Sequence, residues 1–264
     1  MRPALPMSGL RSQTTKSRSA FIRTASATLF RAAALSAGVA LAAPLGLTAV
    51  AQTALQAIDE VDPAQPIADQ VVDLAAWVIA AGDNRGLPFA VVDKRAAQVL
   101  IFGANGKLRG LAPALIGSAV GDDSAPGVGD RELKDIPMKD RTTPAGRFLA
   151  AYGPAAGKQR VLWIDYETAV SIHPLADNST PKEKRKERLA SPGPDDNRIT
   201  HGCINVSKDF YARVVKPTFE KGGVFYVLPD SKTIQAAFPG YDQRIFVASA
   251  AEANKTTNAS FVAR

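Results

Sequence analysis

Short β-prone runs separated by turn residues recur along the chain between residues 88 and 229, and this pattern limits the fold more than any other feature. Runs of this length that are rich in Val, Ile, Phe and Tyr are typical of strands. The first two, 89–92 and 98–102, flank Asp93-Lys94-Arg95 and predict a hairpin. The others are 108–116, 147–152, 161–166, 169–173 and 224–228. The pattern therefore predicts a mostly β domain, an antiparallel sandwich or barrel-like sheet.

Helical spacing appears at two places. Apolar residues recur at helical intervals over 65–81, and the following Gly82 is a typical stop. A second helix is expected after Ser207, which is a favourable N-cap, with Asp209 in its first turn and Pro217 ending or kinking it. One or two short helices should thus accompany the sheet, and a short N-terminal helix should precede it.

The formal charge of +7 would suggest nucleic acid or an anionic surface as a partner if it were spread over a folded domain. It is concentrated at the front instead. The first 51 residues hold six of the 32 basic residues and none of the 25 acidic ones, so the remainder is nearly neutral. We therefore expect no nucleic-acid partner.

The front segment has the order of a secretory signal. A basic region precedes the uncharged stretch 32–51, and Ala49-Val50-Ala51 before Gln52 has the form of an Ala-x-Ala cleavage site. We expect 1–51 to be a cleavable Sec-type signal peptide of an exported, periplasmic protein. The alternative is an uncleaved membrane anchor, but the high content of Ala and Gly and the presence of Pro44 make this stretch a poor span. After cleavage we expect no stable membrane span.

The single cysteine lies in Thr200-His201-Gly202-Cys203-Ile204-Asn205. A lone cysteine in an exported chain forms no internal disulfide, so it is either reactive or paired with another molecule. Its position before a helix and beside a histidine predicts a thiol of lowered pKa, and hence a nucleophile. Gly202 allows a tight bend, so that the amides of Gly202 and Cys203 are the natural oxyanion donors. His173 and His201 are the two possible bases.

These residues resemble the YkuD-type L,D-transpeptidases, bacterial cell-wall enzymes marked by an upstream His and a Ser/Thr-His-Gly-Cys block that Asn or Arg follows. A weaker element of the same family is Thr143-Pro144-Ala145-Gly146-Arg147-Phe148, so the resemblance covers roughly 88–229. It implies that Cys203 is the nucleophile and His173 the base, while His201 orders the loop or lines the site.

Two departures from the family pattern concern His173. Pro174 follows it where the family usually has a small or hydroxyl residue, and the segment 174–199 before the Cys203 block is longer than usual. A long loop costs little closure entropy, so the two groups can still meet. The Pro174 carbonyl remains able to orient the imidazole.

The activity that the resemblance implies is attack by Cys203 on the third residue of a peptidoglycan tetrapeptide stem, at the L-centre of diaminopimelate, with loss of the terminal D-alanine. An amine of an acceptor stem then completes a 3-3 cross-link. Transfer to water, in a carboxypeptidase or an enzyme that detaches a wall-attached protein, is the alternative. A third reading is a peptidoglycan-binding domain without catalysis, in which Cys203 serves folding or a mixed disulfide.

Further roles follow for neighbours of the cysteine. Thr200 is expected to hydrogen-bond the backbone of the block, Asn205 to hold the loop or contact the substrate, and Arg198 to bind a substrate carboxylate. Two histidines and one cysteine offer no metal-ligand cluster, so no metal or other cofactor is expected.

The expected organisation is a signal peptide at 1–51, an extension with a helix at 52–87, the catalytic domain at 88–230 and a tail at 231–264. Within the domain, 117–141 is rich in Gly, Asp and Pro and predicts a loop that rims a cleft. The charged segment 176–198 predicts a solvated loop or short surface helix, with a flap that touches the anionic wall polymer as the alternative.

Overall fold

The computed structural model describes residues 66–155, 160–176 and 181–244. The predicted signal peptide, 1–51, lies outside the described residues, as do the first part of the predicted extension and the end of the predicted tail. No helix in the described part of the chain combines the length and apolar character that crossing a membrane requires.

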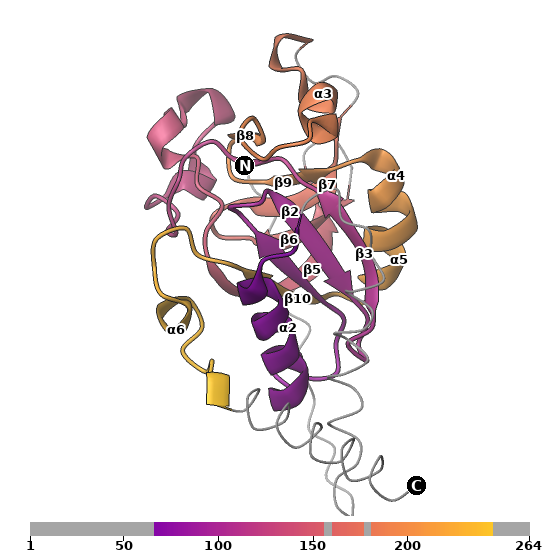
Figure 1. Cartoon of the computed structure of the whole chain (residues 1–264). Coiled ribbons are helices and arrows are strands. Elements are labelled where there is room, and N and C mark those ends of the chain that lie inside the picture. The colour runs from indigo at the N-terminus through magenta and orange to yellow at the C-terminus, as the bar shows by residue number, and fades with distance from the viewer. Residues whose placement is uncertain (1–65, 156–159, 177–180, 245–264) are drawn as a thin grey trace, which may run out of the picture. The chain divides into compact units, whose positions relative to one another are not determined.

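Most of the described strands form one sheet that is strongly curved (Figure 1). Its order is β3-β2-β1-β10-β5-β6-β7-β9, and a separate pair, β4 and β8, lies beside it. The strands are β1 (Phe89–Asp93), β2 (Gln98–Phe102), β3 (Leu108–Pro113), β4 (Ile116–Gly117), β5 (Gly146–Pro154), β6 (Arg160–Asp165), β7 (Val170–Pro174), β8 (Arg198–Thr200), β9 (Ile204–Val206) and β10 (Gly223–Val227). The predicted mostly β fold is confirmed.

The two edges of the sheet meet. Leu115, just after β3, and Asn205 of β9 exchange two backbone hydrogen bonds of 2.8 Å, which makes the sheet nearly closed. Most neighbouring strands are antiparallel, as expected, and the 89–102 hairpin forms. The pairs β1–β10, β7–β9 and β4–β8 are parallel, however, which the strand pattern did not indicate.

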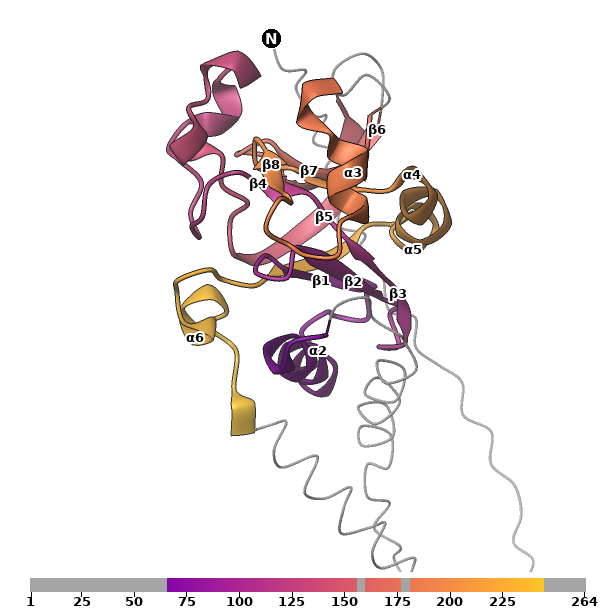
Figure 2. The ribbon, with the colours of Figure 1, turned by 45° about the horizontal axis from the view of Figure 1, so that its top comes forward.

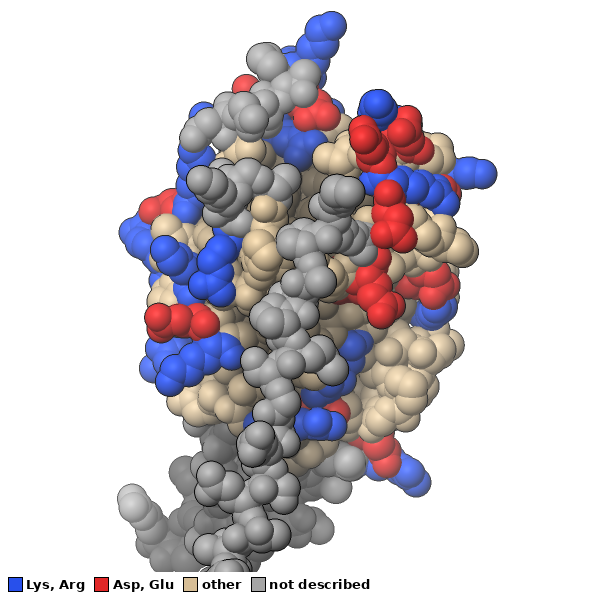
Figure 3. Space-filling view, turned by 180° about the vertical axis from the view of Figure 1, so that it is seen from behind, with Lys and Arg blue, Asp and Glu red and all other residues tan. Residues whose placement is uncertain are grey.

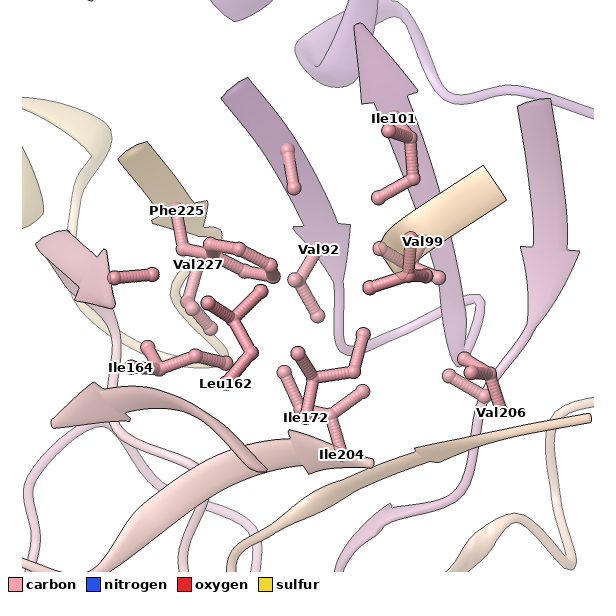
Figure 4. Packing of buried hydrophobic residues seen from close by; sticks show 14 of the residues in the cluster. Val92, Val99, Ile101, Leu162, Ile164, Ile172, Ile204, Val206, Phe225 and Val227 are labelled. Carbon is pink, nitrogen blue, oxygen red and sulfur yellow. The ribbon is translucent and has the colours of Figure 1, made fainter. Parts of the chain in front are cut away.

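Alternate residues of the strands fill two separate cores. Val92 of β1 points inward with Phe225 of β10, into the space between the β1–β2–β10 half and the β6–β7–β9 half (Figure 4), and Ala90 belongs to the same core. The intervening residues, such as Phe89 and Val91, point outward and are just as buried. Because side chains alternate across a strand, a run that is apolar throughout must be covered on both faces.

A helix covers that outer face of the sheet (Figure 2). Helix α2 (Asp69–Ala81) ends at Gly82, which has φ of 64° and caps the last turn as predicted. The short helix α6 (Ile234–Ala237) follows β10, and beyond it Phe238 and Tyr241 join the same core, with the ring of Tyr241 5.5 Å from that of Trp77. Part of the predicted tail therefore packs with α2.

The predicted helix after the cysteine block is present but irregular. It begins as α4 (Lys208–Phe210), where Ser207 accepts a hydrogen bond of 3.1 Å from the Phe210 amide, as expected of an N-cap. It continues as a π-helical turn, η6 (Tyr211–Val215), and ends in α5 (Lys216–Thr218), which contains Pro217.

Two longer segments rise at one end of the sheet, on either side of β8 (Figures 1 and 2). One is the predicted loop, which holds three short 3₁₀ turns, η1 (Val128–Asp130), η2 (Leu133–Asp135) and η3 (Met138–Asp140). The other holds a further 3₁₀ turn, η5 (Pro181–Glu183), and the surface helix α3 (Arg185–Ala190). A short surface helix was one of the two readings of this charged segment.

Charged side chains of both signs lie near one another on the face opposite to that of Figure 1 (Figure 3). This mixture agrees with the near-neutral balance of the chain after its first 51 residues.

Candidate functional site

The cysteine block forms the turn between β8 and β9. Thr200 is the last residue of β8 and Ile204 the first of β9, so His201, Gly202 and Cys203 make the turn itself. Gly202 has φ of 127°, and a Cβ placed on it would lie 2.8 Å from the carbonyl oxygen of Thr142. Only glycine fits here without strain, because both the backbone angle and the close approach exclude a side chain.

Thr200 holds this turn from within. Its hydroxyl donates to the Cys203 carbonyl at 2.6 Å and accepts from the Gly202 amide at 3.1 Å. The expectation that Thr200 bonds to the backbone of the block agrees with these contacts. The Gly202 amide, one of the two expected oxyanion donors, is thus engaged within the turn.

Thr143 supports the turn from outside. Its hydroxyl donates to the Gly202 carbonyl at 2.8 Å and accepts from the Gly117 amide at 2.9 Å, while Lys94 donates to its carbonyl at 3.1 Å. The sequence indicated Thr143 only as the start of a weak motif. Its link to the cysteine turn depends on a contact between distant parts of the chain.

The sulfur of Cys203 faces strand β7. It lies 3.6 Å from the hydroxyl of Ser171 and 3.6 Å from the carbonyl of Ala169. Ser171 and His173 are two residues apart on β7 and so share one face of the strand. The parallel pairing of β7 with β9 sets His173 opposite Asn205 and thereby beside the turn that carries Cys203. Ser171 was not among the predicted site residues.

His173 is held by both ring nitrogens. Nδ1 lies 3.0 Å from the carbonyl oxygen of Pro174, the acceptor expected from the sequence, and Nε2 lies 3.0 Å from Nδ2 of Asn205. The two bonds fix the plane of the ring next to the thiol.

The thiol and the imidazole shift each other's pKa in opposite directions. Burial raises the pKa of Cys203, but hydrogen bonding to His173, the charge of the imidazolium and hydrogen bonds from Ser171 outweigh it and place that pKa below its ordinary value. Burial lowers the pKa of His173, yet hydrogen bonding to Cys203 and the thiolate charge raise it overall. The arrangement favours a thiolate, which is the nucleophilic form.

His201 lies between the two segments that rise beside the site. Burial and the charges of Arg141 and Arg185 lower its pKa, while a hydrogen bond with the Leu133 backbone acts in the opposite direction. Its expected role, to order the loop or to line the site, stays a prediction.

Arg198 is engaged by the protein. Its guanidinium donates to Asp230 at 2.7 Å and to the carbonyl of Lys94 at 3.1 Å, and the side chain is 21% exposed. These partners hold β8 against the neighbouring loops. Binding of a substrate carboxylate by Arg198 stays a prediction.

Asn205 is 1% exposed and bridges two groups. Its Nδ2 meets His173, and its Oδ1 accepts a hydrogen bond of 2.8 Å from Arg185 of α3. Arg185 was not singled out in the sequence, where it stands within a run of charges that is typical of a solvated surface. Among the described residues no cluster of three or more His, Cys, Asp or Glu is arranged to hold a metal ion.

Comparisons with known proteins give partial likenesses. No protein-family model matches the sequence, and no curated protein matches it. The helical cell shape determining protein Pgp2 from Campylobacter jejuni is 15% identical, with a TM-score of 0.38 over 55% of this chain and 49% of that one. The L,D-transpeptidase LdtMt1 in complex with imipenem is 15% identical, with a TM-score of 0.33 over 53% of this chain and 58% of that one.

The catalytic domain of the E. faecium L,D-transpeptidase is 20% identical, with a TM-score of 0.29 over 53% of this chain and 95% of that one. The chain spans about half the length of Pgp2 and little more of LdtMt1. At these levels of identity and superposition, inference about function rests on the site itself.

Proposed function

We propose that this chain is an exported cysteine acyltransferase of the L,D-transpeptidase type, which acts on peptidoglycan tetrapeptide stems and forms 3-3 cross-links. The observation that carries the proposal is the placement of Cys203 in a glycine turn, with its sulfur 3.6 Å from Ser171 of the strand β7, on which His173 shares the face of Ser171. A reactive thiol, a base and a tight turn of backbone amides are the parts that acyl transfer needs.

The steps follow from these groups. His173 takes the thiol proton as Cys203 Sγ bonds to the carbonyl carbon of the third stem residue, and the negative charge moves to the carbonyl oxygen, where the Cys203 amide can donate. The C–N bond to the terminal D-alanine then breaks, and its nitrogen receives the proton from His173. A thioester on Cys203 and free D-alanine result.

The second half resolves the thioester. An amine of a neighbouring stem attacks its carbonyl carbon, His173 accepts the proton that the amine loses, and the same proton returns to the departing sulfur. Water in place of the amine would release a tripeptide stem. The donor peptide bond supplies the energy of the thioester, so no nucleotide is consumed.

In this proposal, the remaining segments of the chain serve export of the protein and support of the catalytic sheet. Residues 1–51 act as a cleaved signal peptide, 88–230 form the catalytic domain, and the flanking helix α2 and the residues after α6 cover the outer face of its sheet. The partners are donor and acceptor stem peptides, with a wall-attached protein as a further acceptor or substrate.

The test is incubation of the purified chain with disaccharide-tetrapeptides and mass analysis of the products. Cross-linked dimers with loss of D-alanine are expected, and both Cys203→Ala and His173→Ala should abolish them. Tripeptides alone would assign the acyl-enzyme to hydrolysis instead. Unchanged substrate with a folded protein would refute the enzyme and favour a wall-binding domain.

A further inference from the structure

Arg185 joins the charged surface segment to the strands that carry the catalytic pair. Its Nη1 donates to Asn205 Oδ1 at 2.8 Å, its Nε donates to Glu183 at 2.8 Å, and its side chain is 16% exposed. A guanidinium held at both of these nitrogens has little freedom to turn. Arg185 therefore belongs to the structure of the site through its contact with Asn205, and it is not a solvated surface charge.

The contact determines how the amide of Asn205 is oriented. A guanidinium only donates hydrogen bonds, so the atom that faces Arg185 must be the amide oxygen. The NH₂ group then points the other way, to Nε2 of His173 at 3.0 Å. Asn205 is 1% exposed, so the reversed amide would leave buried polar atoms without a matching partner.

The amide in turn selects the tautomer of His173. The Pro174 carbonyl can only accept, so Nδ1 carries a hydrogen, and Asn205 Nδ2 can only donate, so Nε2 must present its lone pair. Nε2 therefore carries no hydrogen in this arrangement, and its lone pair accepts from the Asn205 amide.

We propose that Arg185 is a positioning residue for the cysteine reaction: by fixing the amide of Asn205, it holds His173 as the neutral Nδ1–H tautomer, with the lone pair of Nε2 bonded to that amide. The inference rests on the proposed function in that it takes Cys203 as the nucleophile and His173 as its base. It adds a residue outside the cysteine block to the groups that set the protonation of that pair.

Charge acts in the same direction as the amide. Among the residues that the structure describes, the charged or titratable groups that act on His173 are Cys203 and Arg185, and Glu183 pairs with Arg185. The positive charge of Arg185 acts to lower the pKa of His173. The NH₂ group of Asn205, which points at Nε2, also opposes the addition of a second proton to the ring at that atom. Removing Arg185 should free the amide to turn its oxygen to Nε2–H and so favour the imidazolium–thiolate pair.

The experiment measures the rate of Cys203 alkylation by iodoacetamide from pH 4 to 9 in the purified chain. At pH 6, Cys203 of Arg185→Ala should react roughly threefold to tenfold faster than Cys203 of the wild type. This is the change produced when the acid limb, the rising part of the pH–rate profile at low pH, moves by about half to one pH unit to lower pH. Arg185→Lys, which keeps a donor and a charge, should retain most of the wild-type profile.

Arg188→Ala is the matched control. Arg188 belongs to the same helix and donates to the carbonyls of Glu183 at 2.7 Å and Asp196 at 2.5 Å, without a described contact to Asn205. Its loss should loosen α3 but leave the pH profile unchanged. Circular dichroism and thermal melts of each variant report folding separately.

The proposal fails if Arg185→Ala reacts as wild type does, if its acid limb moves to higher pH, or if Arg188→Ala shifts the profile equally. Because alkylation uses no wall peptide, its outcome is independent of the transferase assay. A shifted profile without cross-linked products would retain the role of Arg185 and reject the proposed function alone.

Discussion

The hydroxyl of Thr143 offers the sharpest test of how the cysteine turn is held. It makes two buried hydrogen bonds, to the Gly202 carbonyl at 2.8 Å and from the Gly117 amide at 2.9 Å, and Thr143 is 1% exposed. Valine has nearly the same shape but no hydroxyl, so Thr143→Val leaves two backbone groups unpaired in a dry site. Each such group costs about 1–3 kcal/mol, and we expect a loss of roughly 2–4 kcal/mol in the free energy of unfolding.

Thr143→Ser is the matched control. It keeps the hydroxyl and removes one methyl group, which should cost about 1 kcal/mol. Urea unfolding followed by circular dichroism gives the free energies, and iodoacetamide alkylation of Cys203 in the absence of urea reports on the turn. In Thr143→Val the alkylation rate should also change, because the Gly202 carbonyl loses its anchor. Equal destabilisation by Ser and Val, or a Val variant within about 0.5 kcal/mol of wild type, would show that the hydroxyl does not hold the turn.

Three further results are expected. Gly202→Ala should destabilise the fold by about 1–3 kcal/mol and slow Cys203 alkylation, since its Cβ would lie 2.8 Å from the Thr142 carbonyl at a φ of 127°; urea unfolding at wild-type stability would contradict this. Burial raises the pKa of Asp122, but hydrogen bonds from Lys94 and three backbone amides outweigh it and hold that pKa well below its ordinary value. The ionised Asp122 carboxylate therefore stabilises the fold fully above its unfolded pKa of about 4, and this stabilisation is lost as the pH falls toward the pKa in the folded protein. The urea midpoint of the wild type should thus drop between about pH 5 and 3, and that of Asp122→Asn should drop less. A carbapenem should acylate Cys203, with the added mass found on the peptide that contains it; the same adduct on Cys203→Ala would exclude the thiol as the site.

Local chemistry explains why several elements could be predicted. The hairpin around Asp93-Lys94-Arg95, the stop at Gly82 and the cap at Ser207 each depend on residues close together in sequence. Strand pairing across the chain does not. The parallel contact of β1 with β10 joins residues such as Phe89 and Val224, and nothing in either run specifies its partner or its direction.

The short strands β8 and β9 were missed for a related reason. Each has three residues, too few to show a period, and each is a strand because its partner lies alongside it. The π-helical turn after Phe210 also departs from the regular helix that the spacing of apolar residues predicts. The end of that helix at Thr218, next to Pro217, agrees with the expectation that Pro217 ends or kinks it.

The sequence by itself determined the local chemistry: a lone thiol, a glycine that permits a tight turn, two histidines and alternating apolar runs that must form strands. Such features depend on residue type and near neighbours. Only the tertiary structure decided that β7 and β9 run side by side, which brings Ser171 to the sulfur and sets His173 opposite Asn205, and that Thr143 and Arg185 reach the same site from distant segments. Those contacts arise from packing between remote parts of the chain, and a residue such as Arg185 has the same character in sequence whether it meets water or a buried amide.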